Sequence, residues 1–411
     1  EQAMRHSSAA AKIKPGLKNS NERLEFLGDA ILDSVIAAAQ SGGASADRIV
    51  ADWFRTRRFA GSKDRRAVRE LVYGAIRACG PVPHSGRAAM LRLAQSEPDL
   101  LILFDGSRHA PAPIAEAEEI AADGTAPVWL EQALANSGIA PEQAAQLLGR
   151  APLDIRVNRL RADRDTITLP EAGAPLPAPQ GLRLAAGTAV EQWEAYQLGL
   201  IEVQDGGSQI ACLAVGARAG ETVIDLCAGA GGKTLALAAA MENRGQLIAC
   251  DTDRTRLSRL APRAERAGAS LIQTRLLDPH VEQDALQDLI GKADAVLVDA
   301  PCSGTGTWRR NPEARWRLSE REIARYAALQ SRLLDLAVRL VRPGGRVIFV
   351  TCSLLDAEGA DQAAAFLERY PHWSTDLPLL PAGSPRGVGW RLSPWADETD
   401  GFFIASFTSP C

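Results

Sequence analysis

The chain has 411 residues and a formal net charge of −4, with 46 Lys or Arg against 50 Asp or Glu. This length allows two or three domains with their own cores, and the composition is globular, which excludes fibrous and disordered classes. No apolar run approaches the ~18 residues of a spanning helix, and Met4 is followed by charge. We therefore expect a cytoplasmic protein with no membrane partner.

Residues 1–31 form an atypical first segment. Its His6-Ser7-Ser8 and its stretch from Asn21 to Ala30, NERLEFLGDA, resemble the signature of ribonuclease III, whose paired carboxylates hold magnesium. On a helix, Glu25 and Asp29 would share one face. The second acidic signature and the duplex-RNA-binding domain of that family do not follow. We expect an inactive fragment or a join, which the first residue Glu1 encourages, and no metal; a helix packing in the next domain is the alternative.

Residues 32–127 read as a helical domain followed by a linker. Apolar residues recur at helical spacing, for example Val68, Leu71, Val72 and Ile76. Residues 47 to 90 carry ten Lys or Arg against four Asp or Glu, so this part could lie along a phosphate backbone although the whole chain is acidic. A solvated basic helix face explains the same pattern.

Two further parts follow. Residues 128–205 predict a small α+β subdomain, with a strand near residues 154–158. Residues 206–411 alternate strand and helix, with strands at 223–226, 246–250, 295–298 and 346–350 and a possible one at 271–277. This alternation is typical of a parallel sheet in an α/β domain with a Rossmann-like fold.

A glycine loop follows the first of these strands. It runs from Cys227 through Ala228, Gly229, Ala230, Gly231 and Gly232 to Lys233 and Thr234. Glycines let backbone N–H groups approach a ligand, and a helix amino end favours negative charge. The Walker A pattern fails because Cys227 occupies a glycine position, and the dinucleotide pattern fails at Thr234.

Acidic residues near this loop favour a third ligand, S-adenosylmethionine. Asp225 precedes the glycines, and Asp251 ends the next strand, where a carboxylate can accept hydrogen bonds from a ribose diol. Asp278 follows the possible third strand, near the expected adenine. The simpler interpretation is that Asp251 or Asp253 caps a helix.

Two cysteines lie at the ends of two other predicted strands, Cys302 in Asp299-Ala300-Pro301-Cys302 and Cys352 in Thr351-Cys352-Ser353. Ligands bind at this edge of open α/β sheets. Methylation of cytosine carbon 5 requires a thiolate that adds at carbon 6 and a group that assists at ring nitrogen N3. Asp299 is close enough along the chain for the second role. Buried packing cysteines and a turn-capping Asp299 are the alternative.

Six motifs together resemble one family, the Sun-type (RsmB-type) bacterial 16S ribosomal RNA 5-methylcytosine methyltransferases. The resemblance covers the chain from about residue 32 to the end. The motifs are QDGGSQ at 204–209, DLCAGAGGKT at 225–234, DAPCSGTG at 299–306, RRNPE at 309–313, TCS at 351–353 and DGFF at 400–403.

This resemblance implies that Cys352 attacks carbon 6, that Asp299 assists at N3, and that Cys302 promotes release of the methylated base. The implied donor is S-adenosylmethionine, held by Asp225, the loop from Cys227 to Lys233, Asp251, Asp278 and Asp299. DNA cytosine methyltransferases attack from a Pro-Cys pair like Pro301-Cys302, so spacing alone leaves the two cysteine roles reversible. Many members have Ala-Pro-Gly-Gly-Lys where this chain has Gly229-Ala230-Gly231-Gly232-Lys233.

The resemblance also implies that residues 32–127 are a NusB-like RNA-binding domain. The candidate RNA contacts are Arg65, Arg66, Arg69, Arg309 and Arg310. Trp308 and Trp316, which lie among arginines after the reactive loop, could stack on unpaired bases. Structural arginines and core tryptophans are the alternative.

We expect a monomer that binds 16S ribosomal RNA. Methylation of another RNA such as transfer RNA, and a non-catalytic NusB-like RNA-binding protein, are the alternative functions. The sequence does not identify the methylated nucleotide.

Overall fold

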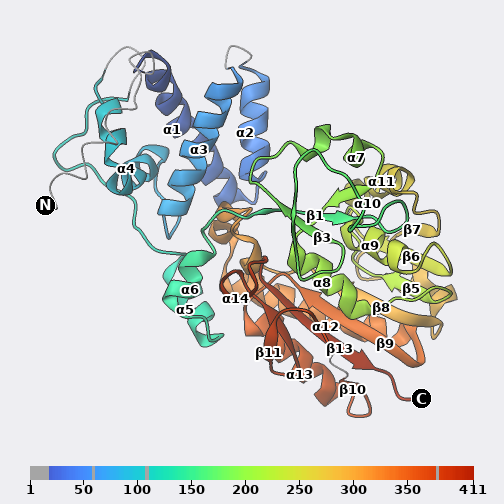
Figure 1. Cartoon of the computed structure of the whole chain (residues 1–411). Helices are drawn as coiled ribbons and strands as arrows, with labels where there is room; N and C mark the ends of the chain where they lie inside the picture. Colours follow the sequence, from blue (N-terminus) through green and yellow to red (C-terminus); the bar gives the residue numbers. More distant parts are fainter. Residues whose placement is uncertain (1–17, 58–60, 107–110, 376–378) are drawn as a thin grey trace, which may run out of the picture. The chain divides into compact units, whose positions relative to one another are not determined.

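The computed structural model describes residues 18–57, 61–106, 111–375 and 379–411, with side chains from residue 28 onward. Packing divides the chain into two units (Figure 1). Unit 1 comprises Glu1–Asn136, Ala140–Gly149 and Asn311–Arg317, and unit 2 comprises Ser137–Ile139, Arg150–Arg310 and Leu318–Cys411. Residues 311–317 thus pack with the amino-terminal helices, whereas the sequence boundaries placed them in the last domain.

Unit 1 is built of helices among its described residues. They are α1 (Lys18–Ser41), α2 (Ala46–Arg55), α3 (Ser62–Ala78), α4 (Gly86–Ser96), the 3-10 helix η2 (Pro98–Leu103), α5 (Val128–Asn136), α6 (Pro141–Gln146) and the 3-10 helix η6 (Pro312–Arg317). The predicted helical character of this region is confirmed.

The core of unit 1 is formed by one apolar stripe from each of its main helices. Val35 of α1, Val50 of α2, Val72 of α3 and Met90 of α4 are fully buried in one cluster. Trp316 of η6 belongs to the same cluster. The 3.6-residue period of the apolar positions explains why these amphipathic helices pack together.

Unit 2 begins with a small antiparallel sheet of order β2-β3-β1-β4. Its strands are β2 (Ala174–Pro175), β3 (Gly181–Leu184), β1 (Leu153–Val157) and β4 (Ile201–Val203). The predicted strand near residues 154–158 is confirmed as β1.

The large sheet of unit 2 has nine strands. The strand order is β11 (Ser384–Arg386), β12 (Gly389–Leu392), β13 (Phe402–Thr408), β9 (Val341–Thr351), β8 (Ala293–Asp299), β5 (Thr222–Asp225), β6 (Gln246–Asp251) and β7 (Ile272–Leu276), and β10 (Ser374–Thr375) pairs with β13. The run from β9 to β7 is parallel, and β13 pairs with β9 antiparallel. All five predicted strands of this part are confirmed.

The helices of unit 2 pack on the small sheet or cover the two faces of the large sheet. They are α7 (Glu194–Gln197), α8 (Gly206–Val215), α9 (Gly232–Ala240), α10 (Arg254–Leu257), α11 (Leu260–Ala267), α12 (Glu320–Leu340), α13 (Ala360–Arg369) and α14 (Pro394–Asp397), with 3-10 helices η3 (Val190–Gln192), η4 (Asp284–Leu289), η5 (Thr305–Thr307) and η7 (Asp356–Glu358).

Alternate residues of one strand enter different cores. Val223 of β5 packs in a cluster with residues of α8, α9 and α11, whereas Ile224 packs in a second cluster with residues of α12 and α13. Strand side chains point to opposite faces with period two, so a parallel strand covered on both sides is apolar throughout. This three-layer arrangement is the Rossmann-like fold predicted from the sequence. Within the described part of the chain, no helix is long and apolar enough to span a membrane.

Candidate active site

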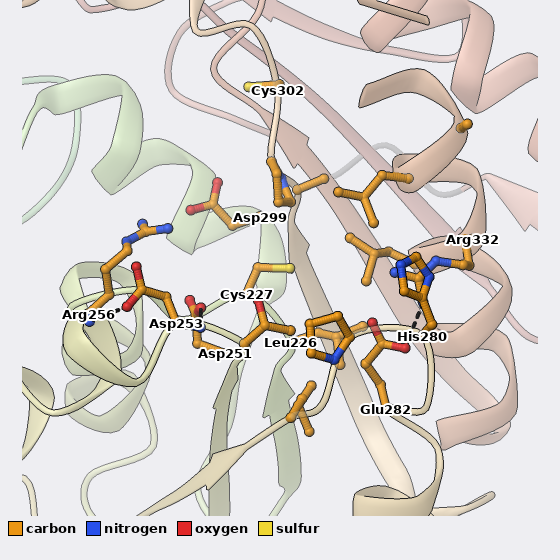
Figure 2. A pocket seen from close by; sticks show the side chains of 18 of the residues that line it. Leu226, Cys227, Asp251, Asp253, Arg256, His280, Glu282, Asp299, Cys302 and Arg332 are labelled. Atoms are coloured by element: carbon orange, nitrogen blue, oxygen red, sulfur yellow. Dashed lines mark hydrogen bonds and ion pairs between the residues drawn. The ribbon is translucent and has the colours of Figure 1, made fainter. Parts of the chain in front are cut away.

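The candidate site lies where four parallel strands of the large sheet end. β5 leads into Cys227, β6 ends at Asp251, β8 ends at Asp299, and β9 leads into Cys352. Because the strands are parallel, their carboxyl ends share one edge, which is where open α/β sheets bind ligands. Figure 2 shows Asp299 and Cys227 on neighbouring segments of this edge, with Asp251 and Asp253 beside them.

The glycine loop turns sharply between β5 and α9. Gly229 has φ 56° and Gly231 has φ 85°, in the left-handed region that favours glycine. A Cβ atom at Gly231 would lie 2.0 Å from Leu260 Cδ1, whereas a Cβ at Gly232 would meet no protein atom within 4 Å. The loop is therefore closed by α11 on one side and leaves an open cradle at the start of α9.

Asp251 ties this loop to the next strand. Its Oδ2 accepts a 2.7 Å hydrogen bond from the Gly229 amide, and its Oδ1 accepts one of 2.7 Å from the Asp253 amide. The side chain of Asp253 accepts from the Thr255 and Arg256 amides and so caps α10. The capping interpretation thus holds for Asp253, and the Asp251 carboxylate retains further lone pairs for a ligand hydroxyl.

Asp225 is fully buried below the loop. Its Oδ2 accepts a 2.6 Å hydrogen bond from the Thr234 hydroxyl, and its Oδ1 has no hydrogen-bond partner among the described residues. Burial raises the pKa of this carboxyl to about 7. Asp225 therefore anchors the first turn of α9 and remains electrostatically unsatisfied.

A cavity of about 770 Å³ runs along this edge of the sheet (Figure 2). Among the residues predicted to bind the methyl donor, Cys227, Asp251 and Asp299 line it; Asp278 is exposed, and its neighbours Leu277 and Pro279 are in the lining. The two candidate catalytic cysteines, Cys302 and Cys352, line it as well. The cavity thus offers carboxylates for a ribose and an ammonium group, apolar walls for an adenine, and thiols at one side, which fits S-adenosylmethionine.

Lys233 connects the glycine loop with the strand end that precedes Cys302. Its Nζ donates a 2.7 Å hydrogen bond to Asp299 Oδ2, and Nζ lies 5.4 Å from the centre of the Phe402 ring. Burial opposes the charge of this ammonium, but the Asp299 carboxylate raises the pKa of Lys233 above its ordinary value. The lysine is therefore held as a cation beside Asp299.

The two cysteines lie side by side. The Sγ atoms of Cys302 and Cys352 are 3.4 Å apart, within hydrogen-bond distance for two sulfurs. The hydrogen bond with Cys352, together with burial, holds the pKa of the Cys302 thiol well above its usual range. Only one of two such close thiols ionises readily, and the proton is held on Cys302.

Cys212 and Cys250 are packing residues. Burial raises the pKa of Cys212 to about 11 and of Cys250 to about 12, and both are buried. Cys227 faces the cavity, but burial holds its pKa well above the ordinary value, so it remains a thiol. The structure therefore singles out Cys302 and Cys352 by their mutual geometry.

The arginines predicted to contact RNA after the reactive loop are engaged in ion pairs. Arg309 pairs with Asp400 at 3.0 Å, and Arg310 bridges Asp400 at 2.5 Å and Asp205 at 3.0 Å. Arg309 and Asp400 are buried, and Asp205 caps α8 through the Gly207 and Ser208 amides. These contacts favour a structural role for both arginines.

The tryptophans near these arginines are buried. Trp308 has no exposed surface and Trp316 is 5% exposed, so neither offers a free ring face to a base. Arg315 donates hydrogen bonds to the Ile76 and Cys79 carbonyls inside unit 1, and burial lowers its pKa to about 9. Trp308 and Trp316 are therefore core residues, which was the alternative to base stacking.

Arg65, Arg66 and Arg69 lie together on α3 and are exposed. Arg69 is 3.7 Å from Asp47, and the Arg65 guanidinium lies 5.6 Å from the centre of the Phe54 ring. The three residues thus form a basic face of unit 1.

The ribonuclease III-like segment falls partly outside the described residues. This applies to residues 6–17 and to the side chain of Glu25. Asp29 lies in α1, where burial raises the pKa of its carboxyl to about 7. Within the described part of the chain, no group of three metal-ligating side chains is present.

Several residues of the site were missed by sequence reasoning. Glu358 contacts the turns that follow both cysteines, Arg263 donates a 2.7 Å hydrogen bond to the Ala230 carbonyl, and Arg332 pairs with Glu282 at 2.6 Å beside the cavity. Each is one charged residue on a helix or turn, and at least one of its partners is distant in sequence. No local pattern distinguishes such residues.

Fold and site together define the class of this protein as a Rossmann-like methyltransferase. The family profile described as 16S rRNA methyltransferase RsmB/F matches residues 212–408. Ribosomal RNA small subunit methyltransferase B of Citrobacter koseri is 34% identical over 340 residues, which cover 79% of this chain and 77% of the relative. The chain belongs to the RsmB/F family of 16S rRNA methyltransferases, as the sequence motifs predicted.

Solved structures share the fold. The crystal structure of PH0851 has a TM-score of 0.73 and 24% identity, and the match covers 93% of this chain and 98% of that one. NSun6 from Pyrococcus horikoshii, solved with SFG, has a TM-score of 0.59 and 19% identity, covering 69% of this chain and 98% of that one. At these identities the similarity supports the fold alone.

Proposed function

We propose that this protein transfers a methyl group from S-adenosylmethionine to carbon 5 of a cytosine in 16S ribosomal RNA, through a covalent bond between Cys352 and the base. One observation carries the proposal most strongly: the Cys302 and Cys352 sulfurs lie 3.4 Å apart in a cavity that Asp299 and Asp251 also line. Membership in the RsmB/F family supports the RNA substrate.

Cys352 is the proposed nucleophile. Its thiolate forms a bond with carbon 6, and the electron pair of the C5=C6 double bond becomes available at carbon 5. The hydrogen bond with Cys352 and burial hold the pKa of Cys302 high, so Cys302 keeps its proton and is the weaker candidate for the nucleophile. This asymmetry favours the assignment that the family resemblance implied.

Asp299 and Lys233 are proposed to assist at the ring. They are joined by a 2.7 Å hydrogen bond, and together they hold one transferable proton at the edge of the cavity. We assign that proton to ring nitrogen N3, where it withdraws electrons from the ring and makes carbon 6 more open to attack.

The donor would be held by the loop residues Gly229, Gly231 and Gly232 and by Asp251, and it supplies the methyl group that carbon 5 receives. Cys302 is then proposed to promote elimination: with Cys352 bonded to the base, Cys302 gives its proton to solvent and its thiolate accepts the carbon 5 proton. The electrons of the broken C–H bond restore the C5=C6 bond, Cys352 departs as a thiolate, and the N3 proton returns to the Lys233–Asp299 pair. Atoms and charges balance, with one proton released per methyl group transferred.

The test uses three cysteine variants, unmodified 16S RNA and donor labelled in the methyl group. We expect the wild-type protein to form 5-methylcytosine, Cys302→Ala to accumulate a covalent protein–RNA adduct, and Cys352→Ala to form no adduct. Cys411→Ala, at an exposed position, is the matched control and should behave as the wild type. Absence of transfer to any RNA by the folded protein would refute the proposal, and an adduct with Cys352→Ala would reverse the two roles.

Further parts of the proposal concern the whole molecule. We propose that unit 1 is a NusB-like RNA-binding domain whose basic face includes Arg65, Arg66 and Arg69, and that the protein acts as a cytoplasmic monomer. Transfer RNA offered in the same assay tests the alternative substrate. The non-catalytic alternative predicts a protein that binds RNA but does not bind S-adenosylmethionine. Calorimetry with S-adenosylmethionine distinguishes this alternative from the methyltransferase.

A further inference from the structure

Glu358 is a fully buried carboxylate that contacts the turns following both cysteines. It is the last residue of η7, six positions beyond Cys352 in the chain. Its Oε1 accepts a 2.8 Å hydrogen bond from the Ser303 amide, and its Oε2 accepts one of 2.7 Å from the Ser353 hydroxyl. The Ser303 hydroxyl donates to Oε2 as well. A buried charge persists in a protein when hydrogen bonds of this kind satisfy it.

Further hydrogen bonds make this arrangement directional. The Leu355 amide donates to the Ser353 hydroxyl at 3.1 Å, and the Leu354 amide donates to the Thr305 hydroxyl at 2.8 Å. Backbone N–H groups can only donate, so both hydroxyls are left to direct their own protons onward. Thr305 then donates to Ser353, 3.1 Å away, and Ser353 donates to Glu358. The chain of donors ends on an acceptor that must be a carboxylate.

The position of this carboxylate relates it to the sulfurs. Ser303 directly follows Cys302, and Ser353 directly follows Cys352, so one side chain holds both turns. The Gly306 amide also donates to the Cys352 carbonyl at 3.0 Å, which closes the second link between the two turns. With the backbone on both sides fixed in this way, the 3.4 Å separation of the sulfurs follows from their placement.

We propose that Glu358 is a positioning residue that sets the separation of the two sulfurs and keeps the proton on Cys302. The role of Glu358 in catalysis rests on the proposed function. Its effect on the reactivity of Cys302 and Cys352 does not depend on that function. Glu358 touches neither the base nor the donor in this scheme. It acts through Ser303 and Ser353.

The negative charge of Glu358 supports the proposal that this residue keeps the proton on Cys302. The Glu358 carboxylate binds the Ser303 amide, so its negative charge lies beside the Cys302 turn, and it contributes to the high pKa of the Cys302 thiol. Other titratable groups also face this region: Lys233 paired with Asp299, and Tyr326 with Arg325 on α12. The Lys233 ammonium interacts electrostatically with Asp299 and, more weakly, with the Cys352 sulfur.

The experiment measures which sulfur reacts with iodoacetamide, without RNA or donor. Peptide mapping by mass spectrometry gives the alkylation rates of Cys302 and Cys352 from about pH 6 to about pH 10 for the wild type and for Glu358→Gln. We expect the wild type to react first at Cys352. In Glu358→Gln, the ratio of Cys352 to Cys302 alkylation should fall at least about threefold, which corresponds to half a pKa unit. Because no substrate is used, failure of the proposed function would leave this result intact.

Asp356→Asn is the matched control. Asp356 begins the same 3-10 helix, but its carboxylate pairs with Arg386 and Arg391 and not with the cysteine turns. This variant should lose stability while keeping the wild-type alkylation ratio. Ser303→Ala and Ser353→Ala remove one hydroxyl each and keep the proposal testable if Glu358→Gln does not fold.

A structural role alone would give a different pattern. In that case Glu358→Gln would lower the thermal midpoint and leave the alkylation ratio at the wild-type value, and this outcome would overturn the inference. A wild-type ratio in folded Ser303→Ala and Ser353→Ala would overturn it as well.

Discussion

Lys233 donates a 2.7 Å hydrogen bond to Asp299, and this pair joins the start of α9 to the end of β8. The two residues are 66 positions apart in the chain. The pair therefore couples the loop proposed to hold the donor with the residue proposed to assist at the cytosine ring. In the proposed mechanism, this pair makes Lys233 a participant in the chemistry and not only a ligand for the donor.

Replacing Lys233 by Met removes the ammonium and leaves the Asp299 carboxylate without its partner. A hydrogen bond to a charged group contributes about 1.5–3 kcal/mol, so we expect methyl transfer to slow by about 10- to 100-fold. Single-turnover assays with labelled donor measure this rate. Lys292→Met, at an exposed position in the same unit, is the control. An unchanged rate in Lys233→Met would remove Lys233 from the mechanism.

The buried Asp225 predicts a pH dependence of stability. Burial raises the pKa of this carboxyl to about 7, above its value in an unfolded chain, so between about pH 4 and pH 7 the folded state holds a proton that the unfolded state has lost. Stability from this group is therefore full at low pH and declines as pH rises through about 7. Across about pH 5.5 to 7.5 we expect a loss on the order of 1–2 kcal/mol.

Asp225→Asn isolates this contribution. The amide does not titrate, so the thermal midpoint of the variant should vary less with pH than that of the wild type over the same range. The comparison matters because Asp29 in unit 1 also has a raised pKa of about 7 and contributes a dependence of the same sign. Identical pH profiles for the two proteins would show that Asp225 is ionised in the folded state.

Much of this site was predictable because the functional residues follow apolar strands. Asp225, Asp299 and Cys352 come at or just after the ends of β5, β8 and β9, and the period and length of those strands are visible in the sequence. Parallel pairing then brings their ends to one edge, as the fold class requires.

What the sequence did not predict depends on long-range pairing. Arg309 and Asp400 are 91 positions apart, and residues 311–317 leave unit 2 to pack in unit 1. Glu358 meets Ser303 across 55 positions. Local periodicity does not indicate which distant charged residue a side chain contacts. Exposed and buried arginines therefore cannot be distinguished in the sequence. For this reason the sequence predicts RNA contact for both Arg309 and Arg66, although Arg309 is buried and Arg66 is exposed.

The difference between these two arginines gives a paired prediction. Arg309 is buried against Asp400, and removing one partner of a buried ion pair costs about 3–5 kcal/mol, so Arg309→Met should lower the thermal midpoint by several degrees. Arg66 is exposed, so Arg66→Gln should leave the midpoint unchanged and weaken RNA binding, with a smaller salt dependence. Thermal melts and RNA titrations at two salt concentrations measure both effects. A stable Arg309→Met that binds RNA weakly would instead place Arg309 at the RNA.

Alanine substitutions at the two glycines at the start of α9 should differ in their effects on stability. Gly231 has φ 85°, and a Cβ there would lie 2.0 Å from Leu260 Cδ1, so Gly231→Ala should strain the loop and destabilise the protein by more than about 1 kcal/mol, on the order expected for a non-glycine residue at positive φ. A methyl group added at Gly232 would have no protein atom within 4 Å, so Gly232→Ala should fold with the wild-type thermal midpoint. If the donor occupies the open cradle beside Gly232, the added methyl group should weaken donor binding in calorimetry while stability is unchanged. Wild-type affinity in Gly232→Ala would show that the donor does not approach the backbone at this position.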